Sequence, residues 1–206
     1  MPARHSFLFA LLLSFVAVTH ATADEGFKPL FDGRTLTGWT GDDKLWSVED
    51  GTIAGTTEGV KLQKNTFLAT EKTYKNFVLK VKFKLRNGNS GIQFRSKSFP
   101  EHVVRGYQAD IAENVFMGIL YEEGGRGILV NVKASEVAEH VKKDDWNEYV
   151  ITADGPHITQ VLNGFTTVDY TEKEEVGAKE GIIALQLHVG PPMRVWFKDI
   201  EIRELP

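Results

Sequence analysis

The sequence has no cysteine among its 206 residues. This absence excludes a disulfide framework, a cysteine nucleophile, a zinc site built from thiolates and a lipid anchor on a cysteine. Basic residues are also few, because 24 lysines and arginines stand against 28 aspartates and glutamates and the formal net charge is −4. A mildly acidic chain lacks the electrostatic features that bind nucleic acid or anionic lipid. We therefore expect neither as a partner.

Long apolar runs are almost absent, and the one that exists lies at the start of the chain. Residues 1–23 combine a basic beginning, an apolar core from Phe7 to Val18 and the small-residue ending Ala21-Thr22-Ala23. This pattern predicts a secretory signal peptide that is cleaved before Asp24. The apolar run is too short to cross a bilayer. The sequence thus predicts a secreted or periplasmic protein in which residues 24–206 form a single domain, with no membrane anchor after cleavage.

Helical periodicity is nearly absent as well, and the dominant hydrophobic period is two. In Phe77–Arg86 apolar residues occupy every second position and, apart from Val78, the residues between them are lysine or arginine, as in a half-buried strand. Asn163-Gly164 is a strong signal for a two-residue hairpin turn. Only Ala134–Lys143 could form a helix, and a short one. Further short strands are predicted at 46–48, 66–69, 90–96, 107–111, 118–121, 127–132, 148–152, 157–161, 165–169, 182–188 and 194–203. The sequence therefore predicts an all-β fold, an antiparallel β-sandwich with at most one short helix.

Three of these strands carry a glutamine followed two residues later by a charged or titratable residue. The pairs are Gln93 and Arg95, Gln108 and Asp110, and Gln186 and His188. Because residues i and i+2 of a strand share a face, each pair presents two polar side chains on one side and apolar side chains on the other. If the strands are neighbours, the six side chains form one polar patch.

Such a patch has two interpretations. It could be an ordinary solvated face. The clearest solvated face of this chain, however, consists of lysines, namely Lys80, Lys82 and Lys84. Glutamine, arginine, aspartate and histidine together donate and accept hydrogen bonds, carry either charge and move protons near neutral pH. Ligands rich in hydroxyl groups, such as sugars, need that mixture. We therefore favour a ligand-binding face.

Several stretches resemble one family along nearly the whole predicted mature chain. They include FKPLFDGRTLTGW, LWSVEDGTIAG, GNSGIQFRS, RGYQADI, GILYEEGGRGIL, DDWNEYVI and GIIALQLHVGPPMRVWFKDIEIREL. In these stretches the chain resembles the 3-keto-disaccharide hydrolase domain family, which has a concanavalin A-like jelly-roll fold. The resemblance implies a glycoside-cleaving enzyme whose sugar has already been oxidised at C3 by a separate sugar 3-oxidoreductase, the expected pathway partner. The substrate is then a small carbohydrate.

The implied reaction fits one feature of the polar face. Jelly-roll glycanases use paired carboxylates on one strand, whereas the corresponding positions here are Gln108, Asp110 and Ala112, with a single carboxylate. A 3-keto sugar needs no such pair, because its carbonyl acidifies the C2 proton. One general base can then start a β-elimination or a net hydrolysis, if donors stabilise the enolate and protonate the leaving group.

The resemblance lets us assign expected roles. His188 and Asp110 are the expected base and its partner or acid, Arg95 is the expected enolate stabiliser, and the three glutamines, Gln93, Gln108 and Gln186, are expected to hold hydroxyl groups. Each has a structural alternative. His188 could be a hydrogen-bonded structural histidine, Asp110 could simply pair with Arg95, and the glutamines could form ladders on the sheet.

The stretch LYEEGGRGIL predicts a second group of binding residues, since loops at sheet edges collect them. Tyr121, Glu122, Glu123 and Arg126 are expected at the rim of the site, with a surface ion pair as the alternative. The histidines and acidic pairs lack metal-ligand spacing, so no metal or other cofactor is predicted. Two other functions remain open. One is a non-catalytic, lectin-like carbohydrate-binding module, and the other is a structural protein of the cell envelope.

Overall fold

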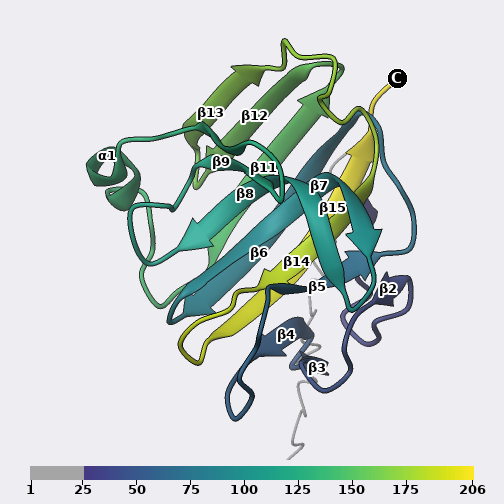
Figure 1. Cartoon of the computed structure of the whole chain (residues 1–206), viewed down its shortest axis with the longest axis vertical. Coiled ribbons are helices and arrows are strands. Elements are labelled where there is room, and N and C mark those ends of the chain that lie inside the picture. The colour runs from purple at the N-terminus through teal and green to yellow at the C-terminus, as the bar shows by residue number, and fades with distance from the viewer. Residues whose placement is uncertain (1–25) are drawn as a thin grey trace, which may run out of the picture.

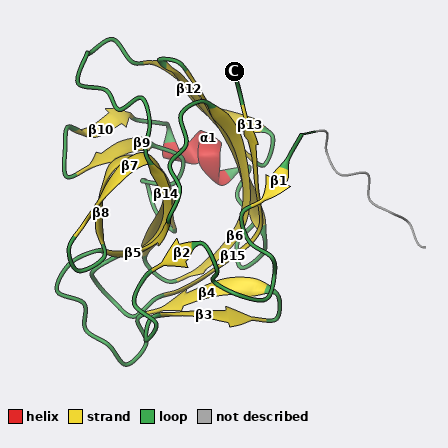
Figure 2. Cartoon of the chain, turned by 90° about the vertical axis from the view of Figure 1, so that its right-hand side faces the viewer, coloured by secondary structure: helices red, strands yellow, loops and turns green. Residues whose placement is uncertain are grey.

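The computed structural model describes residues 26–206, so the predicted signal peptide lies outside the described residues. Two antiparallel sheets pack face to face (Figure 1 and Figure 2), which confirms the predicted sandwich. The first sheet has eight strands. In spatial order they are β13 (Phe165–Thr171), β12 (His157–Leu162), β11 (Asn147–Asp154), β6 (Phe77–Arg86), β15 (Arg194–Glu204), β4 (Thr52–Thr56) and β3 (Trp46–Glu49), with β1 (Lys28–Pro29) also paired to β15.

The second sheet has seven strands and contains five of the six residues of the polar pairs, and His188 follows directly after one of its strands. Its order is β10 (Gly127–Val130), β9 (Leu120–Glu123), β8 (Val103–Ala112), β7 (Asn89–Phe99), β14 (Ile182–Leu187), β5 (Thr66–Thr70) and β2 (Trp39–Thr40). The short helix α1 (Ala134–Ala138) lies within the predicted helical segment but ends earlier, and Val137 is its buried residue. Within the described chain, no helix has the length and apolarity needed to span a bilayer.

The alternation in β6 explains how the two sheets are held together. Phe77, Leu79, Val81, Phe83 and Leu85 are buried, while the residues between them are partly or fully exposed. Phe77 meets Phe94 of the other sheet edge-on, with ring centroids 6.4 Å apart. Burying one such side chain contributes roughly 1.5–3 kcal/mol. The inward faces of both sheets therefore form the main core, and the outer faces are not needed for packing the two sheets together.

Turns fix the register of the strands. Asn163 and Gly164 have φ angles of 49° and 85°, as the two central residues of the predicted hairpin turn require. Strand β4 was not predicted, because it is buried on both faces and does not alternate. A Cβ atom on Gly55 of this strand would lie 2.5 Å from the Trp46 ring of β3. Glycine at this position thus lets the tryptophan lie flat across the neighbouring strand.

The β7–β8 hairpin bends back over the outer face of its own sheet. The backbone N–H of Phe67 in β5 donates to the carbonyl of His102 at the hairpin tip, over 3.0 Å, although β14 separates β5 from β7. A small second core forms beneath the hairpin, made of Phe67, Ala69, Val104, Ile182 and Ala184. The hairpin therefore covers part of the outer face and leaves the rest open.

Candidate functional site

The three strands with polar pairs are neighbours in the order β8, β7, β14. Gln93 lies directly opposite Gln108 in the ladder, and Gly91 lies opposite Asp110. Their sequence neighbours Ile92, Ala109 and Ile111 face the main core, so Gln93, Gln108 and Asp110 share the outer face. Leu185 and Leu187 of β14 also belong to the main core, which turns Gln186 to that outer face. The predicted shared face is therefore present for these four residues.

Arg95 is the exception, and the expectation that it shares the face of Gln93 is wrong. The β7–β8 ladder is irregular between Phe94 and Lys97, and Arg95 has φ 46°, so it is the extra residue of a β-bulge. The bulge shifts the alternation, so that Ser96 rather than Arg95 follows Gln93 on the outer face. The Ser96 hydroxyl donates to Gln93 Oε1 over 2.7 Å.

The Arg95 guanidinium instead forms hydrogen bonds with two loops of the sandwich, the one before β6 and the one between β11 and β12. It donates to the carbonyls of Lys75 and Gly155, each over 2.7 Å, and to Asn76 Oδ1 over 3.0 Å. Burial lowers the pKa of Arg95, although the group remains a cation because the ordinary value is so high. No pairing with Asp110 forms, so that sequence-based alternative is wrong as well.

Replacing Arg95 by alanine is therefore expected to lower the free energy of unfolding and to leave the catalytic rate nearly unchanged. Three hydrogen bonds from a buried charged group are lost, and their acceptors lose their partner, which costs roughly 3–5 kcal/mol. Urea unfolding should show this loss, while kcat/KM of the folded Arg95→Ala protein stays within about threefold of wild type. Arg34→Ala, at an exposed position, is the control. A hundredfold loss of rate without a change in stability would instead show that Arg95 has a catalytic role.

Two of the three glutamines are fully buried on the outer face. Gln93 Nε2 donates to Gln108 Oε1 over 2.9 Å, which leaves Gln108 Nε2 free to point toward Asp110. Gly91 makes this possible, because a Cβ atom there would lie 2.4 Å from Gln108 Cδ. Gln186 is 0% exposed, and neither polar atom of its amide has a partner among the described residues. All three glutamines are therefore buried, and Gln108, which is 2% exposed, is the one that lines a pocket on this face.

A pocket of about 250 Å³ opens on the exposed part of this face, and we call it the outer-face pocket. It brings together Gln108, Asp110, Tyr121, Glu123 and His188, all predicted as site residues. Its complete lining is Asn65, Asn89, Gln108, Asp110, Phe116, Ile119, Tyr121, Glu123, Ile128 and His188. Asn65, Asn89, Phe116, Ile119 and Ile128 were not predicted as site residues. Asn89 and Ile128 lie on strands β7 and β10 and the other three lie in loops, and none belongs to a recognisable motif.

Asp110 is the most perturbed acid of this pocket. Its side chain is only 4% exposed, and burial raises its pKa to about 7, with a further rise from the charge of Glu123. Hydrogen bonds from Asn89 and Gln108 act in the opposite direction. Asn89 Nδ2 donates to Asp110 Oδ1 over 3.2 Å, and from the core Tyr149 donates its hydroxyl to the Asp110 carbonyl over 2.8 Å. Asp110 can therefore hold or release a proton near neutral pH.

His188 has its basic nitrogen defined by one contact. Nδ1 lies 2.5 Å from the carbonyl oxygen of Val189. Because a carbonyl oxygen can only accept, Nδ1 must carry the proton, and the lone pair of the neutral ring lies on Nε2. The half-buried ring lines the pocket immediately after β14. His188 thus has the tautomer that a general base using Nε2 requires.

Glu123 supplies a second carboxylate, which alternation along β8 alone could not reveal. It comes from β9, where it lies opposite Gly106. Asn65 Nδ2 donates to Glu123 Oε1 over 3.1 Å, and the backbone N–H of Val189 donates to Asn65 Oδ1 over 2.9 Å. Since the backbone N–H fixes which end of the amide accepts, Asn65 links Glu123 to the segment that holds His188.

Glu122 and Arg126 do not line the outer-face pocket, and their expected place at its rim is wrong. Glu122 lies opposite Tyr107, whose ring stacks on Phe94 in the core, so it points to the inner side of the sheet. Arg126 Nε donates to Glu122 Oε2 and Arg126 Nη2 to Glu172 Oε2, each over 2.7 Å. The ion-pair alternative therefore describes these two residues. The arginine lowers the pKa of Glu172 to about 2.

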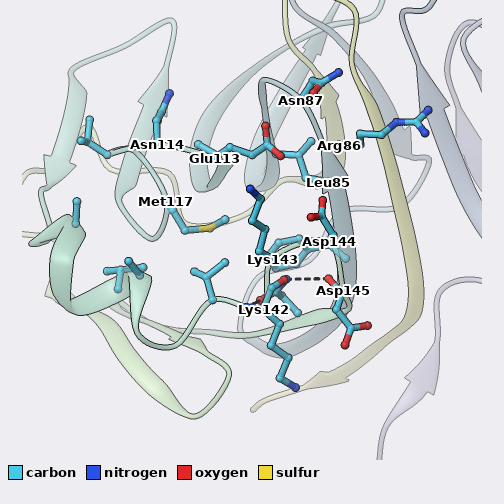
Figure 3. A pocket seen from close by; sticks show the side chains of 18 residues that line it. Leu85, Arg86, Asn87, Glu113, Asn114, Met117, Lys142, Lys143, Asp144 and Asp145 are labelled. Carbon is cyan, nitrogen blue, oxygen red and sulfur yellow. Dashed lines mark hydrogen bonds between the residues drawn. The ribbon is translucent and has the colours of Figure 1, made fainter.

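A larger cavity of about 800 Å³ opens at one end of the sandwich (Figure 3). Leu85 and Met117 contribute apolar surface, and Lys143, Asp144 and Glu113 are among its charged residues. The β8–β9 loop separates the two sites, since Phe116 lines the outer-face pocket while Met117 lines this cavity. The predicted catalytic residues are absent from its lining. Among residues 26–206, no three histidine, aspartate or glutamate side chains converge closely enough to hold a metal ion.

The sequence matches a known domain over nearly all of the described residues. The family profile of the 3-keto-alpha-glucoside-1,2-lyase-like domain matches residues 26–203. The chain belongs to this family. No sequence among the curated proteins matches it significantly.

Solved structures confirm the jelly-roll fold at low sequence identity. A provisionally assigned glycosyl hydrolase from Parabacteroides distasonis has a TM-score of 0.66 and 22% identity, covering 88% of this chain and 95% of that one. The carbohydrate-binding module CBM66 from Bacillus subtilis has a TM-score of 0.63 and 14% identity, covering 81% and 96%. The β-glucanase of Bacillus licheniformis has a TM-score of 0.56 and 12% identity, covering 87% and 97%. These likenesses establish the fold alone, whereas family membership supports a carbohydrate-related function.

Proposed function

We propose that this chain is an exported enzyme that cleaves 3-keto-glycosides by removing the C2 proton and eliminating the substituent at C1. One observation carries the proposal. Asp110, with its pKa raised to about 7, lines the same small pocket as His188, whose Nε2 has a free lone pair. An acid–base elimination requires a proton donor and a proton acceptor in one site, and here the carboxyl of Asp110 and the Nε2 lone pair of His188 can supply them. Membership in the 3-keto-alpha-glucoside-1,2-lyase-like family supports the same chemistry.

In the proposed reaction, the C3 carbonyl of the substrate acidifies its C2 proton. His188 Nε2 takes this proton, the electron pair forms the C1=C2 double bond, and the bond from C1 to the leaving oxygen breaks. Asp110 gives its proton to that oxygen, so that an alcohol leaves. Water can then add to the unsaturated ketone, and the result is net hydrolysis. Because Asp110 must hold a proton, kcat/KM should fall as the pH rises through about 7.

The enolate oxygen at C3 needs a hydrogen-bond donor, and Arg95 lies elsewhere. Tyr121 lines the pocket, and its pKa is raised by burial and by the charges of Glu123 and Asp110. Its hydroxyl therefore keeps its proton and can donate it to the developing charge. Gln108 Nε2 is a second donor at the pocket floor, because Gln93 occupies the Oε1 atom of the same amide.

Oxidation of the sugar is expected to decide which glycosides react. Alcohol release from a 3-keto-glucoside should exceed release from the unoxidised parent by at least about 10³-fold, because only the ketone makes the C2 proton acidic enough for one base. Alcohol release from both compounds measures this difference. In D₂O, elimination followed by water addition places deuterium at C2 of the product above the spontaneous background, whereas direct hydrolysis does not.

The same assay separates the proposed enzyme from its alternatives. Asp43→Asn, which removes an exposed carboxylate outside the pocket, should behave as wild type. Comparable release from both sugars would indicate an ordinary glycosidase that uses Asp110 and Glu123 as its two carboxylates. Binding of both sugars without release from either would identify a lectin-like module.

A further inference from the structure

One wall of the outer-face pocket is apolar, and the proposed proton transfers do not use it. Phe116 and Ile128 line the pocket and are 42% and 44% exposed. Seven large hydrophobic residues are exposed among residues 26–206, and two more of them, Val115 and Val189, adjoin pocket residues in sequence. Single exposed apolar residues are ordinary, but their concentration around one pocket indicates a contact surface.

The register of the sheet places the apolar wall at one side of the pocket. Gln93, Gln108, Tyr121 and Ile128 lie opposite one another on four successive strands, β7, β8, β9 and β10. Side chains in this row change from buried amides, through a phenol, to an exposed aliphatic group. Asp110 and His188 lie on the amide side of the row, because they come from β8 and from the segment after β14.

The size of the pocket limits what can be enclosed. Its volume of about 250 Å³ is below the roughly 300–1,000 Å³ of pockets that enclose a drug-sized ligand. It has room for about one sugar ring beside Asp110 and His188. The other half of a glycoside, the group attached through the C1 oxygen, must then lie against the rim, where Phe116 and Ile128 are exposed.

We propose that the group released from C1 is an apolar alcohol or phenol rather than a second sugar. This inference rests on the proposed function and names its substrate class. The hydroxyl groups of a sugar that packs against Phe116 and Ile128 would gain no hydrogen bond from these two hydrocarbon side chains. An alkyl or aryl group would instead remove the exposed apolar surface from water.

A series of 3-keto-glucosides of methanol, butanol and hexanol tests the proposal. These alcohols have nearly the same acidity, so differences in rate report contact with the leaving group rather than its intrinsic departure. Each methylene that becomes buried contributes up to about 0.8 kcal/mol, which is about fourfold in kcat/KM. We expect the hexyl compound to exceed the methyl compound by at least about 30-fold, and to exceed a 3-keto-disaccharide as well.

Variants locate the effect on the rim. Ile128→Gln and Phe116→Ala should each reduce the hexyl-to-methyl ratio several-fold, because cleavage of the hexyl compound should slow more than cleavage of the methyl compound. Val176→Gln, at an exposed position outside the pocket, is the matched control and should keep the wild-type ratio. Equal rates for methyl and hexyl compounds, or a clear preference for the disaccharide, would overturn the inference while the proposed elimination stands. Failure to cleave any 3-keto-glycoside would overturn the proposed function itself.

Discussion

Asp110→Asn is expected to remove most of the activity and at the same time stabilise the protein at alkaline pH. The amide cannot donate an acidic proton to the leaving group, and loss of general acid–base catalysis typically costs about 10²–10⁴-fold in rate. Hydrogen-bond geometry at the site can persist, because Asn89 Nδ2 can still donate to an amide oxygen at position 110. Aglycone release at pH 7 measures the loss.

The gain in stability follows from the sign of the pKa shift. The pKa of the Asp110 carboxyl is about 7 in the folded protein and near the ordinary value of 3.8 in the unfolded chain. Between these values the folded state binds more protons, so stability falls as the pH rises from about 4 to 7. Above pH 7 the ionised carboxylate costs roughly 4 kcal/mol relative to a neutral group, since each pKa unit is worth about 1.4 kcal/mol.

Urea unfolding of wild type and Asp110→Asn at several pH values checks this result. The two proteins should differ little near pH 4, and the variant should be the more stable by up to about 4 kcal/mol at pH 8. Asp43→Asn, at an exposed position, should follow wild type throughout. If wild type and Asp110→Asn lose stability in parallel across this range, the buried acid of the pocket is not Asp110.

His188→Ala is expected to slow the reaction by about 10²–10⁴-fold without unfolding the protein, because the half-buried ring lines a pocket rather than the core. The proposed base is Nε2, since Nδ1 donates to the Val189 carbonyl. Added imidazole should therefore restore part of the rate to the alanine variant, as it can enter the vacated space. His188→Gln should remain slow, because an amide is not a base at neutral pH.

Exchange of the C2 proton isolates this step. In D₂O, wild type should incorporate deuterium at the C2 position of unreacted 3-keto substrate or of product. The His188→Ala variant should incorporate it far more slowly. His157→Ala, which removes a histidine paired with Asp169 on the other sheet, is the control. A variant at position 188 that exchanges and releases aglycone at nearly the wild-type rate would move the base elsewhere. Glu123 would then be the first candidate, because Glu122 pairs with Arg126 away from the pocket.

The polar face shows how far alternation along a strand predicts a site. Period two placed Gln108 and Asp110 together on the outer face, because β8 is regular through this stretch. The same reasoning failed at Arg95, because one extra residue in β7 shifts the alternation by a single position. A non-glycine residue at φ 46° gives no signal in the sequence, so the bulge could not be predicted.

The sequence by itself determined the fold class, the hairpin at Asn163-Gly164 and the shared face of Gln108 and Asp110, because periodicity and turn chemistry are local properties. Only the tertiary structure decided which of those groups meet. Contacts between β9, the β4–β5 loop and the segment after β14 bring Glu123, Asn65 and His188 to Asp110. Burial by the folded chain raises the pKa of Asp110, and desolvation of this kind depends on the whole surrounding structure rather than on neighbours in sequence.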